Sequence, residues 1–575
     1  MFISLDSLSD DARYDLIVIG AGAGGMAAAL FAAVEDQKVL LVESTEYVGG
    51  TTAISAATTW IPNTHHAASV NPDDNRERAR KFLDGVVGNR SPAVLREAFL
   101  ESGPEAIALL DSRTDVKFRP YATHPDYEQQ YEGATMCGRA LEPVPFDGKT
   151  LGPDLHRIRP PIPEFTVFGG MMVDRTDINH LLNYRKSWKS FAHATRILCR
   201  YALDRLSGPR GSRLVIGNAL IGRFLLSLQK RGVDILTRTT VKQFLVENGA
   251  VRGAVLGSGS LSRRVASSKG VVLAAGGYNH HPVRRGALLP KQGPIHCPGA
   301  PGHTGAMQDL AIELGAQLGD TNLDNALWAP VSIRTRPDGS TAAFPHFVLD
   351  RSKPGTVCVD QSGRRFVNES TSYHRFARAM FERDRTIPCI PCFIITDAAG
   401  LRKYGLGMVR MGTGNLAPYL TDGYLVQAAT VAELADKIKV GAAALEKTVA
   451  DMNAYAKTGH DPEFGRGTTP YHRINGDASV GPNPTLGPIA TAPFYAVRLY
   501  PGDIGAATGL VINEWAQVMR TDGSPIAGLY ACGNEANSIM GGTYPGPGIT
   551  IGPAIVFGYR AVRHALKVTK TRQVA

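Results

Sequence analysis

The sequence predicts an α/β fold in which a discontinuous Rossmann-type domain carries an inserted α+β domain. Apolar, strand-like runs that end in glycine occur near the N-terminus, near residue 276 and near residue 533. Such runs, spread over most of the chain, indicate one sheet assembled from distant segments. Between the last two runs the sequence changes character. We therefore expect residues 1–327 and 500–575 to form the first domain, and residues 328–499 to form the inserted substrate domain.

The composition is that of an ordinary globular enzyme. Of 575 residues, 43% are hydrophobic and 20% are charged, as in typical folded domains. No apolar run reaches the length of a transmembrane helix, and the acidic N-terminus lacks the features of a secretory signal. The seven cysteines are scattered, which favours reduced thiols, buried in the case of "CIPC" (389–392). These features predict a cytoplasmic protein.

The first strand, turn and helix have the spacing of a dinucleotide-binding motif. In "YDLIVIGAGAGGMAAALFAA", Gly20, Gly22 and Gly25 follow an apolar run, and the next strand ends in Glu43. In such βαβ units the first glycine makes the turn, the second admits a pyrophosphate and the third packs helix on strand. The acidic residue then takes a ribose hydroxyl.

Two further features favour FAD over NAD. A second glycine turn, "GGTT" (49–52), follows Glu43, and two distant strands end in "AAGG" (274–277) and "CGN" (532–534). A domain wrapped along an extended cofactor explains this arrangement better than a simple NAD domain does. The predicted FAD-binding residues are Gly20, Ala21, Gly22, Gly25, Met26, Glu43, Ser44, Gly49, Gly50, Thr51, Thr52, Val241, Ala274, Ala275, Gly276, Gly533, Asn534, Gly548, Ile549 and Ile551.

Three other segments have their own signals. Asn248-Gly249 predicts a tight hairpin turn. Residues 430–456 read as helical, inside the inserted domain. Residues 150–213 carry eleven Lys and Arg against five Asp and Glu, with Trp188 and other apolar residues near helical spacing. This basic, partly helical segment is compatible with a membrane surface, with an entrance cover, or with an ordinary surface helix.

Near the C-terminus, "GGTYPGPGITIGPA" (541–554) places one tyrosine among glycines and prolines just before an expected helix. Proline fixes φ and glycine permits conformations that other residues avoid, so the stretch predicts a rigid loop. Such a loop can be a plain turn, or it can present Tyr544 and backbone N–H groups to a ligand.

Taken together, these motifs resemble the 3-ketosteroid dehydrogenases, within the fumarate reductase/succinate dehydrogenase flavoprotein superfamily. The resemblance covers nearly the whole chain and rests on "GAGAGGMAAA", "GGTTAISAATTWIPN", "HPDYEQQYEGATMCGRALEPVPFDG", "VLAAGGY", "RRFVNESTSY", "PGDIGAATGL" and "GLYACGNEANSIMGGTYPGPGITIGPA". It implies non-covalently bound FAD and 1,2-dehydrogenation of a cyclic ketone, with a proton and a hydride leaving adjacent carbons.

The resemblance also implies residue roles. Tyr544 matches the residue that hydrogen-bonds the ketone oxygen, with the backbone N–H of Gly548 as its partner. Tyr373 matches the acceptor of the α-proton, and Tyr127 matches the tyrosine that supports it. Tyr121 and Tyr131 are close enough in sequence to leave the last assignment open. The family pattern has proline immediately before the catalytic tyrosine, where this chain has Ser372.

Physical chemistry agrees with these roles. Removing a proton α to a ketone requires stabilisation of the developing enolate, which a hydroxyl and an N–H in fixed positions provide. A tyrosine has an ordinary pKa of about 10, so the site is expected to lower the pKa of its base.

Three alternatives for the reaction stay open. The same chemistry can act on a small monocyclic ketone of the cyclohexanone or oxocyclohexanecarboxylate type. The chain can instead be a fumarate-reductase-like ene-reductase, for which His374 and Arg375 supply cations, or a Δ4-(5α) desaturase that uses Tyr495 and Tyr500.

The expected partners are a cyclic ketone, most simply a steroid, and an unidentified external electron acceptor. No nucleic-acid motif is evident, and peripheral membrane contact through residues 150–213 is left open. The pairs His65-His66 and His280-His281 do not have the sequence spacing of a metal site, so none is predicted.

Overall fold

A nine-stranded sheet forms one half of the molecule in the computed structural model, which describes residues 1–206, 208, 210–336 and 338–567. Strands from both ends of the chain meet in it, because the C-terminal strand pairs in parallel with the end of the longest strand. The path is β1 (Phe2–Ile3), β11 (Asp234–Leu236), β3 (Val39–Val42), β2 (Ala12–Ile19), β14 (Leu261–Leu273), β13 (Ala250–Ser258) and β12 (Thr240–Glu247), with β22 (Pro525–Ala531) beside β14 and β21 (Gln517–Met519) beside β22.

Helix α1 (Ala23–Val34) is buried along its whole length. Its alanines and glycines let α15 (Ile551–Ala565) and α6 (Ile216–Lys230) approach closely, as in helices whose small side chains form the contact. This arrangement places the N-termini of α1 and α15 inside the molecule. Helices α2 (Arg76–Val87), α3 (Ala93–Arg113), α7 (Arg284–Leu288) and α8 (Ala306–Glu313) complete this half, with a small sheet of β4 (Thr59–Trp60), β5 (Phe118–Pro120) and β6 (Ala140–Pro143).

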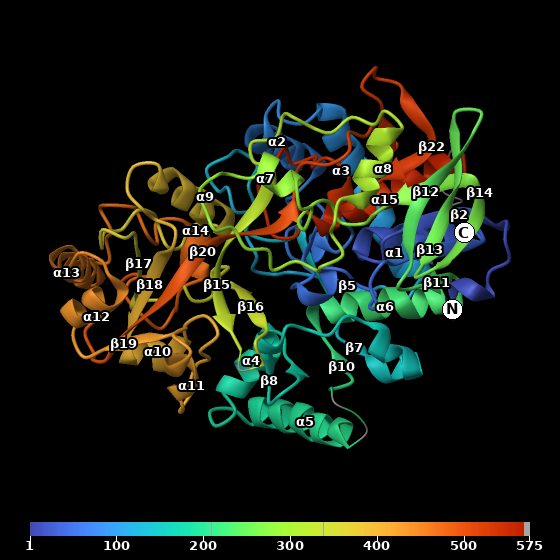
Figure 1. Cartoon of the computed structure of the whole chain (residues 1–575). Coiled ribbons are helices and arrows are strands. Elements are labelled where there is room, and N and C mark those ends of the chain that lie inside the picture. The colour runs from blue at the N-terminus through green and yellow to red at the C-terminus, as the bar shows by residue number, and fades with distance from the viewer. Residues whose placement is uncertain (207, 209, 337, 568–575) are drawn as a thin grey trace.

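A second, antiparallel sheet forms the other half, at the left of Figure 1. The expected domain boundaries, 327/328 and 499/500, fall inside two paired strands of this sheet, β15 and β20. Its strands are β16 (Thr341–Pro345), β15 (Ala326–Thr335), β20 (Phe494–Ala506), β18 (Cys392–Asp397), β17 (Thr356–Val359) and β19 (Val426–Ala428). Its helices are α9 (Tyr373–Asp384), α10 (Ala398–Tyr404), α11 (Ala417–Thr421), α12 (Val431–Ile438), α13 (Ala442–Thr458) and α14 (Pro470–Ile474).

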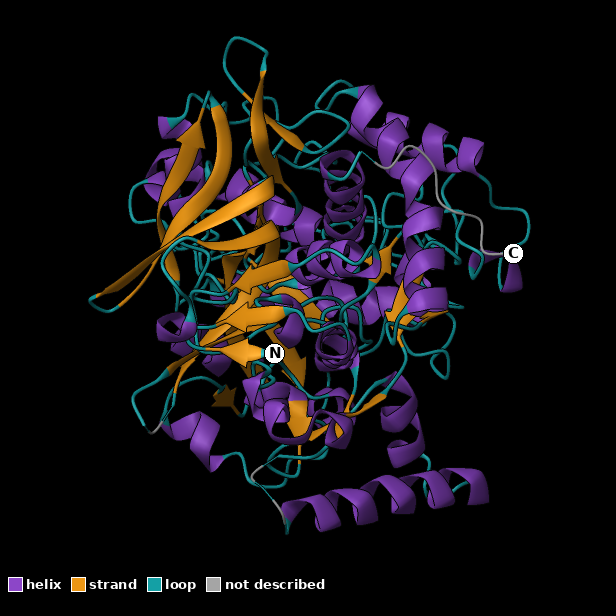
Figure 2. Ribbon diagram, turned by 90° about the vertical axis from the view of Figure 1, so that its right-hand side faces the viewer, coloured by secondary structure: helices purple, strands orange, loops and turns teal. Residues whose placement is uncertain are grey.

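Most of the described residues of 150–213 form an arm at the edge of the molecule (Figure 2), whereas Leu151, Leu155 and Ile158 at its start pack into the main hydrophobic core. The arm also contacts the second sheet, where the ring of Phe165 packs on that of Phe344. Its long helix, α5 (Trp188–Arg205), packs against α4 (Arg175–Leu182), with the short pairs β8 (Thr166–Val167)–β9 (Met171–Met172) and β7 (Phe146–Asp147)–β10 (Arg213–Leu214) at its base. Ile197 and Tyr201 of α5 are buried, whereas Trp188 and Phe191 are exposed. The apolar residues at helical spacing therefore lie on two faces of α5, one buried and one exposed.

Several local predictions are confirmed. Asn248 and Gly249 both have positive φ, 50° and 77°, and connect β12 to β13, the turn geometry that Asn-Gly favours in tight hairpins. Cys389 and Cys392 are free and buried. None of the helices in the described part of the chain is long and apolar enough to cross a membrane.

Candidate active site

The contacts of the turn between β2 and α1 explain why each of the three motif positions is glycine. Gly20 has a φ of +103°, and a Cβ there would lie 2.3 Å from the carbonyl oxygen of Ala274. A Cβ on Gly25 would lie 1.8 Å from the carbonyl oxygen of Gly20. A Cβ on Gly22 would meet nothing within 4 Å, and no group in the described ranges accepts a hydrogen bond from its N–H. The chain therefore packs against the first and third glycines and leaves open space at the second, where a helix N-terminus favours a phosphate.

Glu43, at the end of β3, is held beside this turn. Its buried carboxylate accepts hydrogen bonds from the N–H of Ala21 at 3.0 Å, and from the N–H and hydroxyl of Thr45 at 2.9 and 2.8 Å. These bonds fix the carboxylate next to the open space at Gly22. The contact with a ribose hydroxyl stays a prediction.

The 49–52 turn lies across from the start of α1. A Cβ on Gly50 would be 3.5 Å from the Cα of Gly22, and the hydroxyl of Thr52 accepts from the N–H of Ala23 at 3.4 Å. The two glycine turns predicted from sequence are therefore in direct contact.

The ends of β14 and β22 also meet. Glu535 accepts a hydrogen bond from the N–H of Gly277 at 3.1 Å, and a Cβ on Gly277 would be 2.6 Å from the carbonyl oxygen of Asn534. A cavity beside them is lined by Gly533, Asn534, Ile549 and Thr550, among others. Segments separated by hundreds of residues therefore share one extended site.

The other predicted cofactor residues occupy several environments. Ala274, Ala275 and Gly276 are half-buried at the end of β14, and Gly49 and Thr51 belong to the 49–52 turn. Met26 and Val241 are buried on α1 and β12, Ile551 is buried at the start of α15, and Ser44 is exposed beside Glu43. The open space at Gly22 and its free N–H fit the pyrophosphate of FAD.

Three tyrosines from distant segments converge where α9 and the 541–550 loop meet. The ring centroids of Tyr373 and Tyr544 are 5.0 Å apart, and those of Tyr127 lie 5.5 Å from Tyr373 and 5.8 Å from Tyr544. The hydroxyl of Tyr127 donates to that of Tyr373 over 3.4 Å. The structure thus brings together the three side chains that the resemblance singled out.

The geometry distinguishes Tyr127 from its neighbours in sequence. The N–H of Tyr127 donates to the carbonyl oxygen of Pro545 at 2.8 Å, which ties its segment to the loop that carries Tyr544. Tyr131 lies against α2, where a Cβ on Gly85 would be 2.9 Å from its ring. Tyr121 packs on His124 instead, with centroids 4.7 Å apart. Of these three tyrosines, only Tyr127 has a ring contact with Tyr373.

Ser372, which stands where the family pattern has proline, is the N-cap of α9. Its side chain accepts a hydrogen bond from the N–H of Arg375 at 3.4 Å. A serine cap fixes the first turn of a helix, so Tyr373 is held at the helix start despite the departure from the pattern.

The 541–550 loop packs on the backbone of β4 through a glycine that cannot be replaced without movement. Gly548 has a φ of +92°, and a Cβ there would lie 2.2 Å from the carbonyl oxygen of Thr58. Its carbonyl oxygen accepts from the N–H of Trp60 at 3.2 Å, while nothing in the described ranges accepts from its own N–H. The Gly548 N–H therefore remains available to a ligand near Tyr544.

Burial dominates the electrostatics of the tyrosine cluster. It raises the pKa of Tyr373 and of Tyr127 well above the ordinary value, and it raises that of Tyr544 to about 12. The expected lowering of the base's pKa is therefore not a property of these side chains alone. Arg175 opposes burial, because its positive charge lowers the pKa of Tyr127 and of Tyr471.

Three side chains at the site were missed from sequence. The ring of Tyr471 lies 5.0 Å from that of Tyr127, and Phe347 lies 5.0 Å from Tyr373. His303 lies beside Gly276, where burial lowers its pKa to about 4. None of them belongs to a recognisable motif, so only the tertiary structure reveals them.

Comparison with known proteins shows the family of the chain. The FAD binding domain family matches residues 15–551. A 4-oxocyclohex-2-ene-1-carboxylate 5-dehydrogenase of Sinomonas cyclohexanicum is 36% identical over 97% of this chain and 95% of its own length. A 3-oxosteroid 1-dehydrogenase of Mycolicibacterium smegmatis is 33% identical over 96% of both chains. The crystal structure of 3-ketosteroid Δ1-dehydrogenase from Sterolibacterium denitrificans with 1,4-androstadiene-3,17-dione has a TM-score of 0.90 and 32% identity, covering 96% of this chain and 99% of that one.

Proposed function

The chain belongs to the FAD binding domain family of the fumarate reductase flavoprotein superfamily, and on this premise we propose that it removes two vicinal hydrogens from the ring of a cyclic ketone. FAD, when bound, supplies the acceptor for the hydride. The observation that carries the proposal is the convergence of Tyr127, Tyr373 and Tyr544 beside the free N–H of Gly548.

In this proposal Tyr544 and the N–H of Gly548 hold the ketone oxygen. Both are donors on a loop fixed by its packing on Thr58, so little reorganisation is needed as negative charge develops on that oxygen. The raised pKa of Tyr544 keeps its hydroxyl protonated and able to donate.

Tyr373 receives the proton that leaves the carbon α to the ketone, once its own proton has left and it stands as the phenolate. Its hydroxyl already interacts with that of Tyr127 at 3.4 Å, which offers a route for the proton away from the substrate. Burial raises the pKa of Tyr127, and the charge of Arg175 offsets part of this effect. Tyr127 is thus proposed to support the base rather than to act on the substrate.

The reverse reaction, reduction of an unsaturated dicarboxylate, requires more than one free cation, because the substrate carries two carboxylates. The two cations nearest in sequence to Tyr373 are engaged elsewhere. His374 lies 3.1 Å from Asp324, and Arg375 lies 2.5 Å from Glu128. We therefore favour dehydrogenation.

The first substrate we propose is a 3-ketosteroid, dehydrogenated between carbons 1 and 2. The support is the overall similarity to the ketosteroid enzyme solved with a steroid ligand. The test is anaerobic bleaching of the flavin by a 3-keto-4-ene steroid, in wild type and in Tyr373→Phe. Rapid bleaching in wild type that is lost in the variant supports the proposal. If the steroid leaves the flavin absorbance of wild type unchanged, the proposal is contradicted.

A second candidate is an oxocyclohexanecarboxylate, favoured by Arg175. This guanidinium lies 5.3 Å from the ring centroid of Tyr121 and is close enough to act on Tyr127 and Tyr471. No carboxylate in the described part of the chain forms an ion pair with it. A cation at that position suits a ketone that carries an acidic group across the ring.

The discriminating measurement compares 4-oxocyclohexanecarboxylate with its methyl ester. If Arg175 binds the carboxylate, Arg175→Gln raises KM for the acid at least tenfold and leaves the ester unchanged. Arg185→Gln, in the same arm but stacked on Tyr184, is the matched control. Equal effects on acid and ester would remove this candidate.

We also propose that the arm of residues 150–213 lies on a lipid surface, which would suit a lipid-soluble substrate. Trp188 is 79% exposed and Leu206 is 83% exposed, and Phe191 and Leu203 are exposed between them. They recur at helical spacing on the face of α5 opposite its buried residues, with basic side chains alongside. Flotation with anionic liposomes should carry wild type and leave Trp188→Ser/Leu206→Ser behind, while equal distribution of the two would contradict it.

A further inference from the structure

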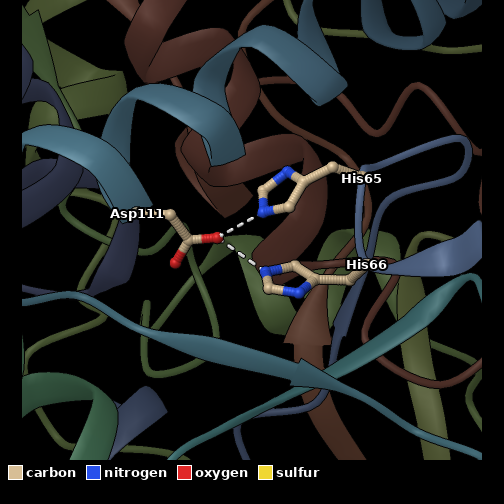
Figure 3. Close-up of side chains that lie close together, drawn as sticks. All are labelled: His65, His66 and Asp111. Carbon is tan, nitrogen blue, oxygen red and sulfur yellow. Dashed lines mark hydrogen bonds and ion pairs between the residues drawn. The ribbon is translucent and has the colours of Figure 1, made fainter. Parts of the chain in front are cut away.

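Outside the tyrosine site, two histidines and an aspartate converge on one point (Figure 3). His65 and His66 follow β4, and Asp111 lies in the last turn of α3. The Nε2 atoms of His65 and His66 lie 3.0 and 2.6 Å from the same carboxylate oxygen of Asp111. We propose that these three residues bind a divalent transition-metal ion, with Zn²⁺ as the first candidate.

The backbone makes this convergence possible. In a strand, adjacent side chains point to opposite faces. His66 has helical dihedral angles, a φ of −70° and a ψ of −32°, and it begins a short 3₁₀ turn. Both rings therefore turn to the same side, where their centroids are 4.0 Å apart. Adjacent histidines become two ligands of one site only because of this turn.

The distances suit a metal after a small movement. The ligand atoms of the three residues all lie within 4.8 Å of one another. A zinc ion bound at about 2.0–2.2 Å from nitrogen and oxygen needs its ligands roughly 3.3 Å apart. His66 and Asp111 are largely buried, with 18% and 16% of their side chains exposed, whereas His65 is 49% exposed. Two ligands are thus fixed, and the third can adjust at the solvent edge.

The charge at this point also favours a cation. Asp111 is near the C-terminus of α3, where the helix dipole already places partial negative charge. The ammonium group of Lys117 bonds to the backbone carbonyl of Asp111 and leaves the carboxylate to the histidines. A divalent ion would neutralise the carboxylate, to which the ammonium does not bond.

The ligand types select the class of metal. Two imidazoles and one carboxylate suit Zn²⁺, Co²⁺ and Ni²⁺, whereas Ca²⁺ and Mg²⁺ prefer oxygen ligands alone. The exposed edge at His65 leaves room for water to complete the coordination. Because the loop continues from β4, which supports Gly548, an ion there would brace the strand beneath the tyrosine site.

The test is calorimetric titration of the full-length, FAD-containing protein with ZnCl₂ after treatment with EDTA. We expect one saturable site in wild type and at least a tenfold loss of affinity in His65→Ala and in Asp111→Asn. His281→Ala is the matched control, since His281 also contacts an aspartate, Asp309, at 3.1 Å but has no second histidine there. It should bind as wild type does.

A spectroscopic measurement covers the case in which a variant does not fold. Wild type loaded with Co²⁺ should show the visible absorbance of a histidine- and carboxylate-bound ion, and an equivalent of Zn²⁺ should abolish it. The proposal is overturned if wild type shows no saturable binding. It is also overturned if folded His65→Ala and Asp111→Asn bind Zn²⁺ as tightly as wild type does.

Discussion

Two glycines of the first turn should respond to alanine in opposite ways. In Gly25→Ala the new methyl group would lie 1.8 Å from the carbonyl oxygen of Gly20. Helix propensity favours alanine by about 1 kcal/mol, but overpacking against backbone costs about 3 kcal/mol. The expected net effect is a loss of about 2 kcal/mol in the stability of the apoprotein.

In Gly22→Ala the apoprotein should be unaffected. Gly22 has a φ of −79° and a ψ of −176°, which alanine adopts readily, and the methyl group would meet no protein atom. The same methyl group would occupy the space into which the pyrophosphate of FAD fits. A contact of this kind costs about 1–3 kcal/mol, which weakens binding roughly 5- to 150-fold.

The assay measures both quantities in both variants. Thermal unfolding of the apoprotein reports the fold, and fluorescence titration with FAD reports the dissociation constant. The reasoning fails if Gly22→Ala binds FAD as wild type does, or if apo Gly25→Ala melts at the wild-type temperature. The first result would mean that FAD does not run past Gly22. The second would mean that the turn can relax around the new methyl group.

Three other predictions concern Tyr544, Gly548 and Glu535. Tyr544→Phe keeps the ring packing and removes one donor to the ketone oxygen. Flavin bleaching by substrate should therefore slow about 10²- to 10³-fold, with unchanged FAD content. A smaller change in the rate would contradict the role of Tyr544. Gly548→Ala places a Cβ 2.2 Å from the carbonyl oxygen of Thr58, so the loop must move. The rate of flavin bleaching by substrate should fall at least as far as in Tyr544→Phe, and a variant that bleaches at the wild-type rate would disprove this. Burial raises the pKa of Glu535 from 4.5 to about 7, so the folded state keeps a proton that the unfolded state loses, and stability falls as pH rises from about 4.5 to 7. Glu535→Gln removes this loss of stability. The difference in unfolding free energy between the variant and wild type should therefore shift by about 3 kcal/mol in favour of the variant between pH 4.5 and pH 8. Urea unfolding of both apoproteins at both pH values would measure it, and a difference that does not change with pH would contradict it.

Local signals in the sequence were sufficient wherever one segment determines its own shape. Asn248-Gly249 predicts its turn because both residues adopt positive φ at low cost. The β2–α1 motif predicts part of its own geometry because Gly25 packs on the carbonyl oxygen of Gly20, five residues earlier, whereas the contact of Gly20 with Ala274 depends on the sheet. The family resemblance added Tyr127, Tyr373 and Tyr544, whose positions in motifs do not depend on knowing the fold.

What sequence could not supply are contacts between segments that have no motif. Tyr471 joins the tyrosine cluster only because α14 packs against it, and the charge of Arg175 acts on it only because α4 starts nearby in the fold. The same holds for the direction of the pKa shift at Tyr373, which depends on how much solvent the surrounding side chains exclude.

The sequence by itself therefore determined the cofactor motif, the α/β class and the residue types of the chemistry, since each is encoded over short stretches. Only the tertiary structure decided which tyrosine stands beside Tyr373, which face of α5 is exposed, and that His65 and His66 share Asp111. Those outcomes depend on the packing of distant elements, where a side chain's neighbours are set by the whole core rather than by its place in the chain.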